Sequence, residues 1–319
     1  RFINHTTIMA AGDAQIHGFR FEQQHGKERV RVGRVWRNGD GSHSFVEWSV
    51  GISLLSDCVA AYSTGDNSDI VATDTMKNTV YVKAKECLEQ VSVEEFAIKL
   101  AEHFTSFYQQ VASATIKIVE KPWERVQIGD LLHDHGFKLG SERRTAEVTL
   151  KKSGAVQVTS GIEGLSLLKT TQSGFEGFIR DKYTILPETQ ERMLATEVTA
   201  LWRYHFEDTS VIARCSFNFT KQYQNVKNVL ANTFFGPPKG GVYSPSVQHT
   251  LYQMAEAVLN RCQDISSVQL QMPNIHFLPV NLSSRDNPVV VKFEDDVYLP
   301  TDEPHGSIVA TLSRLSSKL

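Results

Sequence analysis

The most regular pattern of apolar positions lies between residues 92 and 111. Ser92-Val93-Glu94-Glu95 has the form of a capping box, in which a Ser and the Glu three residues later satisfy free backbone N–H groups at a helix start. Apolar residues then recur every three or four positions, at Val93, Phe96, Ala97, Leu100, Ala101, Phe104, Phe107, Tyr108 and Val111. We expect a helix whose wide apolar stripe packs on a sheet as core.

Strand patterns lie on both sides of this helix. Residues 27–35 alternate apolar with basic side chains, and residues 44–54 continue the same period after Asn38-Gly39-Asp40-Gly41. Two alternating runs around a Gly-rich turn predict a β-hairpin. Two later runs, 114–119 and 145–150, extend the antiparallel sheet, with the helices gathered on one face.

A shorter pattern surrounds Thr73. The apolar residues 70–72 lead into Thr73-Asp74-Thr75, which predicts a helix start capped by Thr73 or Asp74. Met76, Val80 and Ala84 then recur on one helix face. A strand is the alternative, because residues 79–82 are β-branched and aromatic; we favour the helix. Taken alone, Thr73-Asp74 is more often a cap than a catalytic group.

The second half repeats the order of elements. Residues 151–164 are small and polar, so we expect a hinge there. Beyond it we expect strands through Phe178, a short helix from Pro187, and a strand with period two at Val198, Ala200, Trp202 and Tyr204. We therefore divide an α+β chain into tandem domains at 9–155 and 156–319. Residues 1–8, which precede Met9-Ala10, are set aside as a possible non-native leader.

A further helix is expected after the turn-rich connector 236–241. Ser244 is the expected cap and Pro245 the first helical residue, which places Val247 and Gln248 in the first turn. Free N–H groups and the helix dipole favour an anion at such a position.

Two other stretches have candidate chemistry. Phe175 stands between Gly174 and Gly177, so a flat ligand could approach the ring, although a bulge with a core aromatic fits equally well. Asn274 and His276 are two residues apart, and on an extended segment they face the same side. Beside a proline, such a pair is more often a set of loop hydrogen-bonding groups.

Composition removes several functional classes. A formal net charge of −3 gives no basic stripe for nucleic acid. No uncharged apolar run approaches the roughly 20 residues that a spanning helix needs, and no signal-peptide core is found. The histidines form no zinc-ligand pattern, and His133-Asp134-His135 is expected in a surface loop. The four cysteines lie far apart, as expected of buried thiols in a reducing compartment: Cys58, Cys87, Cys215 and Cys262.

Five separated motifs resemble those of the urate oxidase (uricase) family, in the family's order. They are Gly26-Lys27, the string SDIVATDTMKNTVYVKAK at 68–85, the segment from Phe175 to Arg192, Val247-Gln248, and Pro273-Asn274-Ile275-His276. The resemblance covers nearly the whole chain. It implies tandem tunnelling-fold domains whose sheets join into barrels in a homotetramer.

The resemblance also implies the site. Each site would lie at a subunit interface, with Lys27, Thr73 and Asp74 from one chain and the remaining residues from its neighbour: Phe175, Arg192, Val247, Gln248, Asn274 and His276. Urate would be oxidised by O2 and water to 5-hydroxyisourate and hydrogen peroxide, without a metal or another cofactor. A Lys27–Thr73–His276 relay would move protons, and Thr73 with Asn274 would hold dioxygen.

Two other functions are compatible with these residues, and the C-terminal tripeptide indicates a location. A pterin-handling enzyme of the same fold also binds flat heterocycles, and a catalytically silent purine-binding homologue would keep the same residues. Ser317-Lys318-Leu319 matches the tripeptide that the peroxisomal import receptor reads, so we expect a peroxisomal protein.

Overall fold

The computed structural model describes residues 14–16, 18–282 and 292–315, so the leader 1–8 and the tripeptide 317–319 lie outside the described residues. The chain forms two compact units. Unit 1 comprises Arg1–Ser160 and Tyr204–Thr220, and unit 2 comprises Gly161–Arg203 and Lys221–Leu319. The division is not a single cut, because the segment 204–220 belongs with the first unit.

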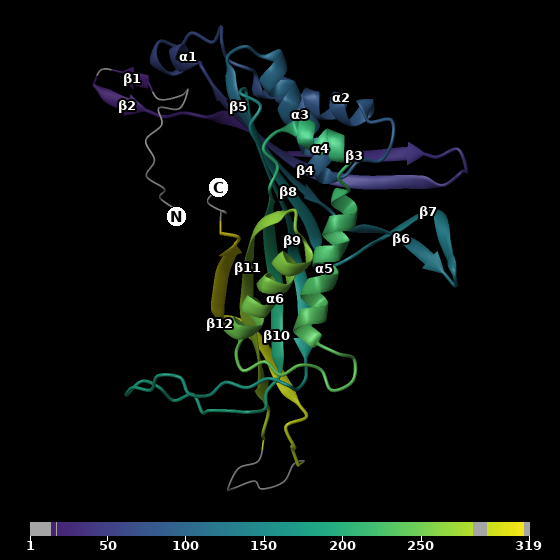
Figure 1. Ribbon diagram of the computed structural model, residues 1–319, viewed down its shortest axis with the longest axis vertical. Coiled ribbons are helices and arrows are strands. Elements are labelled where there is room, and N and C mark those ends of the chain that lie inside the picture. Colours follow the sequence, from purple (N-terminus) through teal and green to yellow (C-terminus); the bar gives the residue numbers. More distant parts are fainter. Residues whose placement is uncertain (1–13, 17, 283–291, 316–319) are drawn as a thin grey trace. The chain divides into compact units, whose positions relative to one another are not determined.

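Unit 1 is a mixed structure of antiparallel strands and helices (Figure 1). Its elements are β1 (Ala14–Ile16), β2 (Phe19–Phe21), β3 (His25–Arg37), β4 (His43–Ser56), α1 (Val59–Ser63), α2 (Thr73–Glu86), α3 (Val93–Phe107), β5 (Val111–Glu120), β6 (Trp123–Ile128), β7 (Leu131–Leu139), β8 (Arg143–Lys151) and α4 (Thr209–Cys215). The sheet order is β3, β4, β5, β8, with every neighbouring pair antiparallel. The predicted hairpin and both later strands are confirmed.

The predicted helices α2 and α3 are confirmed as well. Ser92 accepts a hydrogen bond from the Glu95 backbone, and the Glu95 side chain closes the capping box. The apolar stripe of α3 packs on β5 and β8, and Phe96 stacks on the buried Trp48 at a centroid distance of 4.5 Å. Favouring a helix after Thr73 was correct, because α2 buries Met76, Val80 and Ala84 in the same unit.

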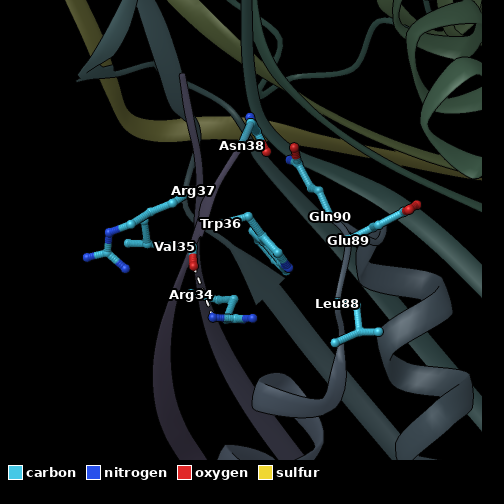
Figure 2. A pocket seen from close by; sticks show the side chains of 8 residues that line it. All are labelled: Arg34, Val35, Trp36, Arg37, Asn38, Leu88, Glu89 and Gln90. Atoms are coloured by element: carbon cyan, nitrogen blue, oxygen red, sulfur yellow. Dashed lines mark hydrogen bonds between the residues drawn. The ribbon is translucent and has the colours of Figure 1, made fainter. Parts of the chain in front are cut away.

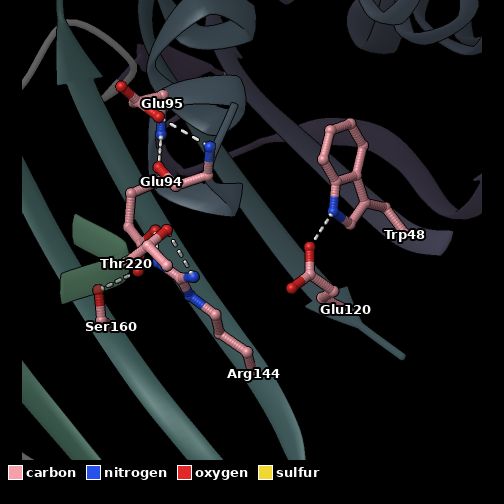
Figure 3. Close-up of polar contacts among 8 residues, drawn as sticks. Trp48, Glu94, Glu95, Glu120, Arg144, Ser160 and Thr220 are labelled. Atoms are coloured by element: carbon pink, nitrogen blue, oxygen red, sulfur yellow. Dashed lines mark hydrogen bonds and ion pairs between the residues drawn. The ribbon is translucent and has the colours of Figure 1, made fainter. Parts of the chain in front are cut away.

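A buried polar network crosses the interior of unit 1 (Figure 3). The Glu94 carboxylate on α3 accepts hydrogen bonds from Arg144 Nη2 at 2.6 Å and from Ser160 Oγ at 2.6 Å. Arg144 Nη1 also donates to the Thr220 hydroxyl at 3.2 Å. Glu94 is fully buried, so these donors replace the water that its carboxylate lost. Beside it, burial raises the pKa of Glu120, against the effect of the hydrogen bond from Trp48 Nε1.

The hairpin β6–β7 was missed from the sequence. Its strands pair over Trp123↔Leu139 to Ile128↔Leu131, and all of their side chains are exposed or half-buried. His133 and His135 therefore lie in strand β7 and not in a loop, although His135 is exposed as expected. The two rings contact each other edge to face at 4.8 Å.

Unit 2 holds the remaining elements. They are most of β9 (Val156–Lys169), most of β10 (Leu194–Tyr204), most of α5 (Phe219–Phe235), α6 (Val247–Arg261), β11 (Ile265–Pro279) and β12 (Tyr298–Ser313). These strands follow one another in the order β9, β10, β11, β12, and β11 and β12 are antiparallel. The period-two strand predicted around residues 198–204 is confirmed as β10. The segment expected to be a hinge is instead a turn at 152–154 followed by β9.

Residues 170–193 are irregular, which corrects two expectations. We predicted strands through Phe178 and a short helix from Pro187, but the segment contains only isolated bridges, Ser173↔Ser244 and Phe175↔Thr189. Its conformation depends on a bridge across the segment, Phe175↔Thr189, and on one to the distant Ser244, and local propensity reports neither.

The cysteines are free thiols. Cys58, Cys87 and Cys262 are buried as expected, whereas Cys215 is exposed near the end of α4, so that part of the prediction was wrong. Across the described ranges, no helix is both long and apolar enough to cross a membrane.

Candidate functional site

The first group of predicted site residues stands at the start of α2 in unit 1. Thr73 is the first helical residue and Ala72 is the N-cap, with no side-chain cap bond, so the expected capping role of Thr73 or Asp74 was wrong. Asp74 instead accepts from Lys77 Nζ at 2.5 Å and Asn78 Nδ2 at 2.9 Å. The Thr73 side chain is exposed, and among the described residues no hydrogen bond to it is found.

Lys27 lies beside this helix start on β3. The β3–β4 register shifts between Lys27 and Val30, which marks a bulge at this point of the strand. His25 Nε2 lies 3.1 Å from the carbonyl oxygen of Val71, and this contact ties the strand to the segment that enters α2. The pKa of Asp74 is lowered chiefly by the hydrogen bond and charge of Lys77, with a smaller contribution from the charge of Lys27. Lys27, Thr73 and Asp74 are named the Thr73 cluster.

The second group is centred on Phe175 in unit 2. Phe175 N donates to Thr189 O at 2.7 Å and Thr189 N returns a bond at 3.1 Å. A Cβ on Gly174 would lie 2.8 Å from Thr189 O, so the glycine is required for this close approach. The Phe175 ring stacks on Phe178 at 4.8 Å, so a planar ligand must use the opposite face or displace Phe178.

Arg192 lies against the same ring. Its Cζ is 5.5 Å from the Phe175 centroid, its backbone N donates to Ser173 O at 2.9 Å, and its Nε donates to Ser173 Oγ at 3.3 Å. Burial lowers the pKa of the guanidinium, with Tyr243 acting in the opposite direction. The structure therefore places a half-buried cation beside an aromatic ring. Ser173, Phe175 and Arg192 are named the Arg192 cluster.

Val247 and Gln248 occupy the first turn of α6, as predicted. The cap differs, however, because Ser246 accepts from the His249 backbone at 3.1 Å and Val247 is the first helical residue. Ser244 and Pro245 precede the helix. Val247 is buried, and Gln248 is exposed at the helix start.

Asn274 and His276 lie on β11 at an irregular point of its pairing with β12. Asn274 pairs with Gly306 and His276 pairs with Thr301, so the register shifts between the two residues. Both side chains are half-buried. Within the described ranges, neither Asn274 nor His276 makes a hydrogen bond or ion pair with the Arg192 cluster.

Sequence reasoning missed Lys169 at the end of β9. Lys169 Nζ donates to Val242 O at 2.7 Å and to Ser244 Oγ at 2.7 Å, immediately beside the Arg192 cluster. A usable signal was present in the sequence, because Leu165, Ser166 and Leu167 alternate apolar with polar and Lys169 continues the apolar face.

A cavity of about 300 Å³ lies elsewhere in unit 1 (Figure 2). Arg34 and Trp36 of β3 face the segment Leu88–Gln90 across it, and both donate to the Cys87 carbonyl, at 3.1 and 2.9 Å. The Arg34 guanidinium is thus engaged in fixing the segment after α2. None of the predicted site residues lines this cavity, so we do not assign it to the site.

No metal site is found in the part of the chain that the structure describes, since no three His, Cys, Asp or Glu side chains are suitably gathered. The Arg192 cluster by itself combines a hydroxyl, an aromatic ring and a guanidinium, which are groups suited to binding a planar anion.

Comparisons with known proteins match both units. The family model described as Uricase matches residues 23–149 and 158–309. Uricase-2 isozyme 1 of Glycine max is 67% identical over 304 residues, which cover 95% of this chain and 98% of that protein. The uricase of Arabidopsis thaliana is 67% identical over 306 residues, covering 96% of this chain and 99% of that protein.

A solved structure of a uricase has the same fold. The crystal structure of uricase from Arthrobacter globiformis superposes with a TM-score of 0.81 at 36% identity, and the match covers 93% of this chain and 95% of that one. The arrangement of strands and helices described above is therefore shared with that enzyme.

Proposed function

Because the chain belongs to the uricase family and is an oxidoreductase that uses oxygen, we propose that it converts urate, O2 and water to 5-hydroxyisourate and hydrogen peroxide in purine degradation. Urate loses two electrons, O2 gains them together with two protons, and water supplies the hydroxyl group of the product. The observation that carries the proposal is the contact between the Arg192 guanidinium and the Phe175 ring.

The binding roles follow from the chemistry of these side chains. Arg192 and Gln248 hold the urate anion in its own plane, with the guanidinium giving charge-assisted hydrogen bonds. Val247 adds a backbone N–H from the first turn of α6, where the helix dipole favours negative charge. Phe175 supplies the face on which the purine stacks.

The reactive roles fall to the remaining residues. Thr73 and Asn274 hold dioxygen, and afterwards water, over the other face of the purine. Lys27, Thr73 and His276 form the relay that removes and returns protons. The exposed, unengaged Thr73 hydroxyl supports this role, because it has no competing internal partner among the described residues. The scheme uses no metal, flavin or haem.

The finer architecture is part of the same proposal. The two units are tandem tunnelling-fold domains, and four chains form a homotetramer in which sheets join into barrels. Each site then takes Lys27, Thr73 and Asp74 from one chain and the other residues from its neighbour. Ser317-Lys318-Leu319 directs the protein to the peroxisome through its import receptor.

One assay tests the reaction. Purified protein is mixed with urate in air, with a chelator present, and loss of the urate ultraviolet band is followed together with peroxide release. We expect one peroxide for each urate consumed. Activity that stops with the chelator would reject the metal-free scheme, and turnover of neopterin without turnover of urate would favour the pterin-handling alternative. Tight urate binding without turnover would indicate the silent homologue.

A further inference from the structure

Lys169 is a half-buried lysine whose acceptors are all uncharged. Its Nζ lies 2.7 Å from Val242 O, 2.7 Å from Ser244 Oγ and 3.4 Å from Phe234 O, and 5.5 Å from the Phe234 ring centroid. Phe234 is in the last turn of α5, where carbonyl groups and the helix dipole favour a cation. Among the described residues no carboxylate pairs with this ammonium group.

The Ser244 that Lys169 holds is joined directly to the purine-binding segment. Ser244 N donates to Gln172 O at 2.9 Å, and Gly174 N donates to Ser244 O at 2.9 Å. Ser173, between these two residues, is completely buried. The Ser173 carbonyl accepts a hydrogen bond from the Arg192 backbone N, and the Ser173 hydroxyl accepts one from Arg192 Nε. Hydrogen bonds and the backbone between them therefore connect Lys169, through Ser244 and the segment Gln172–Gly174, to Arg192.

A second branch reaches the start of α6. The Thr250 hydroxyl lies 2.7 Å from Ser244 Oγ and 3.1 Å from Ser246 O, the carbonyl of the α6 N-cap. An ammonium group only donates, so Ser244 Oγ must accept from Lys169, and the Ser244 hydroxyl hydrogen points away from Nζ. The same contact thus restrains the turn that carries Val247 and Gln248.

We propose that Lys169 is a positioning residue for the substrate, whose ammonium group holds Val242 and Ser244 and thereby sets the geometry of Arg192, Phe175 and the first turn of α6. This role rests on the proposed function and deepens it. Burying a cation without a carboxylate costs stability, whereas a positive charge beside an anion site adds to binding. Burial accordingly lowers the pKa of Lys169 from 10.5 to about 8.

The test separates binding from turnover. Urate affinity is measured by equilibrium dialysis under nitrogen, where no oxidation occurs, and kcat and KM are measured in air. For Lys169→Met we expect the Kd and KM for urate to rise about tenfold or more, because the charge-assisted contact with Ser244 is lost. The kcat should change less than about threefold. Lys169→Arg keeps a cation with several donors and should recover part of the affinity.

Two further variants complete the design. Ser244→Ala removes the shared acceptor, and its effect on Kd should not add to that of Lys169→Met, because both break one pathway. Lys239→Met is the control, since Lys239 is exposed on the connector before α6, and its Kd should equal that of the wild-type protein. If Lys169→Met does not fold, Lys169→Arg and Ser244→Ala decide the question by the same measurement.

The outcomes are distinguishable. Unchanged Kd per folded site in Lys169→Met, with only fewer sites, would mean a purely structural lysine and overturn the positioning role alone. Failure of the wild-type protein to oxidise urate would refute the proposed function, and the positioning role would then be decided by the urate Kd of Lys169→Met under nitrogen alone. A tenfold loss of affinity with retained kcat supports both.

Discussion

The Thr73 cluster of unit 1 and the Arg192 cluster of unit 2 differ in how far their polar groups are already engaged. Thr73 is exposed without an internal partner among the described residues, and the Asp74 side chain is 70% exposed and paired with a surface lysine. Arg192 is half-buried and held twice by Ser173, which is itself completely buried. Thr73 is thus free to take a new partner, whereas Arg192 is held in place before any ligand binds.

This difference matches two tasks of the proposed active site. Binding an anion tightly requires groups whose orientation is fixed in advance, because ordering them on binding costs affinity. Proton transfer requires a hydroxyl or amine that can exchange partners during the reaction. We therefore expect substitutions in the Arg192 cluster to change affinity, and substitutions in the Thr73 cluster to change turnover.

Lys27→Met should give the largest effect. It removes the base of the proposed relay, so kcat should fall about 10²-fold to 10⁴-fold, while urate affinity under nitrogen stays within a few-fold of wild type. Stopped-flow loss of the urate band measures the first quantity and equilibrium dialysis the second. Lys85→Met, an exposed lysine in the last turn of α2, is the matched control. Full turnover in Lys27→Met would remove the relay from the mechanism.

Arg144→Met should be the next largest, and it acts on stability. It leaves the fully buried Glu94 without its cation, which should cost about 3–5 kcal/mol of unfolding free energy in unit 1. Urea unfolding at fixed protein concentration measures the loss. Lys117→Met breaks an exposed pair with Glu147 and should cost under about 1 kcal/mol. Equal losses would mean that the buried network contributes no more to the stability of unit 1 than an exposed ion pair does.

Arg192→Lys tests whether the Arg192 cluster determines urate affinity. Lysine keeps the charge but loses the planar set of donors, so urate affinity should fall about tenfold to a hundredfold, with a smaller change in kcat. Arg203→Lys, an exposed arginine on β10, should leave affinity unchanged. A loss confined to kcat would contradict the assignment of Arg192 to binding.

The sequence was most informative where structure is decided locally. The capping box Ser92–Glu95 and the stripe of α3 involve neighbours along the chain, and both were predicted correctly. The residues 170–193 were mispredicted because Phe175 bonds to Thr189 across the segment, and Gln172 and Gly174 bond to Ser244 far along the chain. Ser244 was mistaken for a helix cap for the same reason: its hydroxyl is held by Lys169 and Thr250.

The residues of the candidate site also fall into those that the sequence could identify and those that it could not. Lys27, Thr73 and Arg192 could be named from motifs, since a motif preserves the type and order of side chains. Lys169 belongs to none of those motifs. The alternation along β9 places it on the buried face, but its partners are identified only when β9, α5 and the segment before α6 are placed together. Hydrogen bonds between distant segments were therefore the part that sequence could not supply.

The smallest expected effect is a pH dependence that originates at Lys169. Burial lowers its pKa from 10.5 to about 8, so the unfolded chain binds more protons between these values and this group makes folding more favourable as pH rises from 8. Urate affinity should change in the opposite direction, because deprotonation removes the charge and one donor, by about threefold or less from pH 7 to 9. Tyr243, Arg192 and Glu191 also lie on the adjoining segments and remain in Lys169→Met, so subtracting that variant's profile isolates Lys169. A difference profile that is flat from pH 7 to 9 would show that Lys169 acts through its shape and not through its charge.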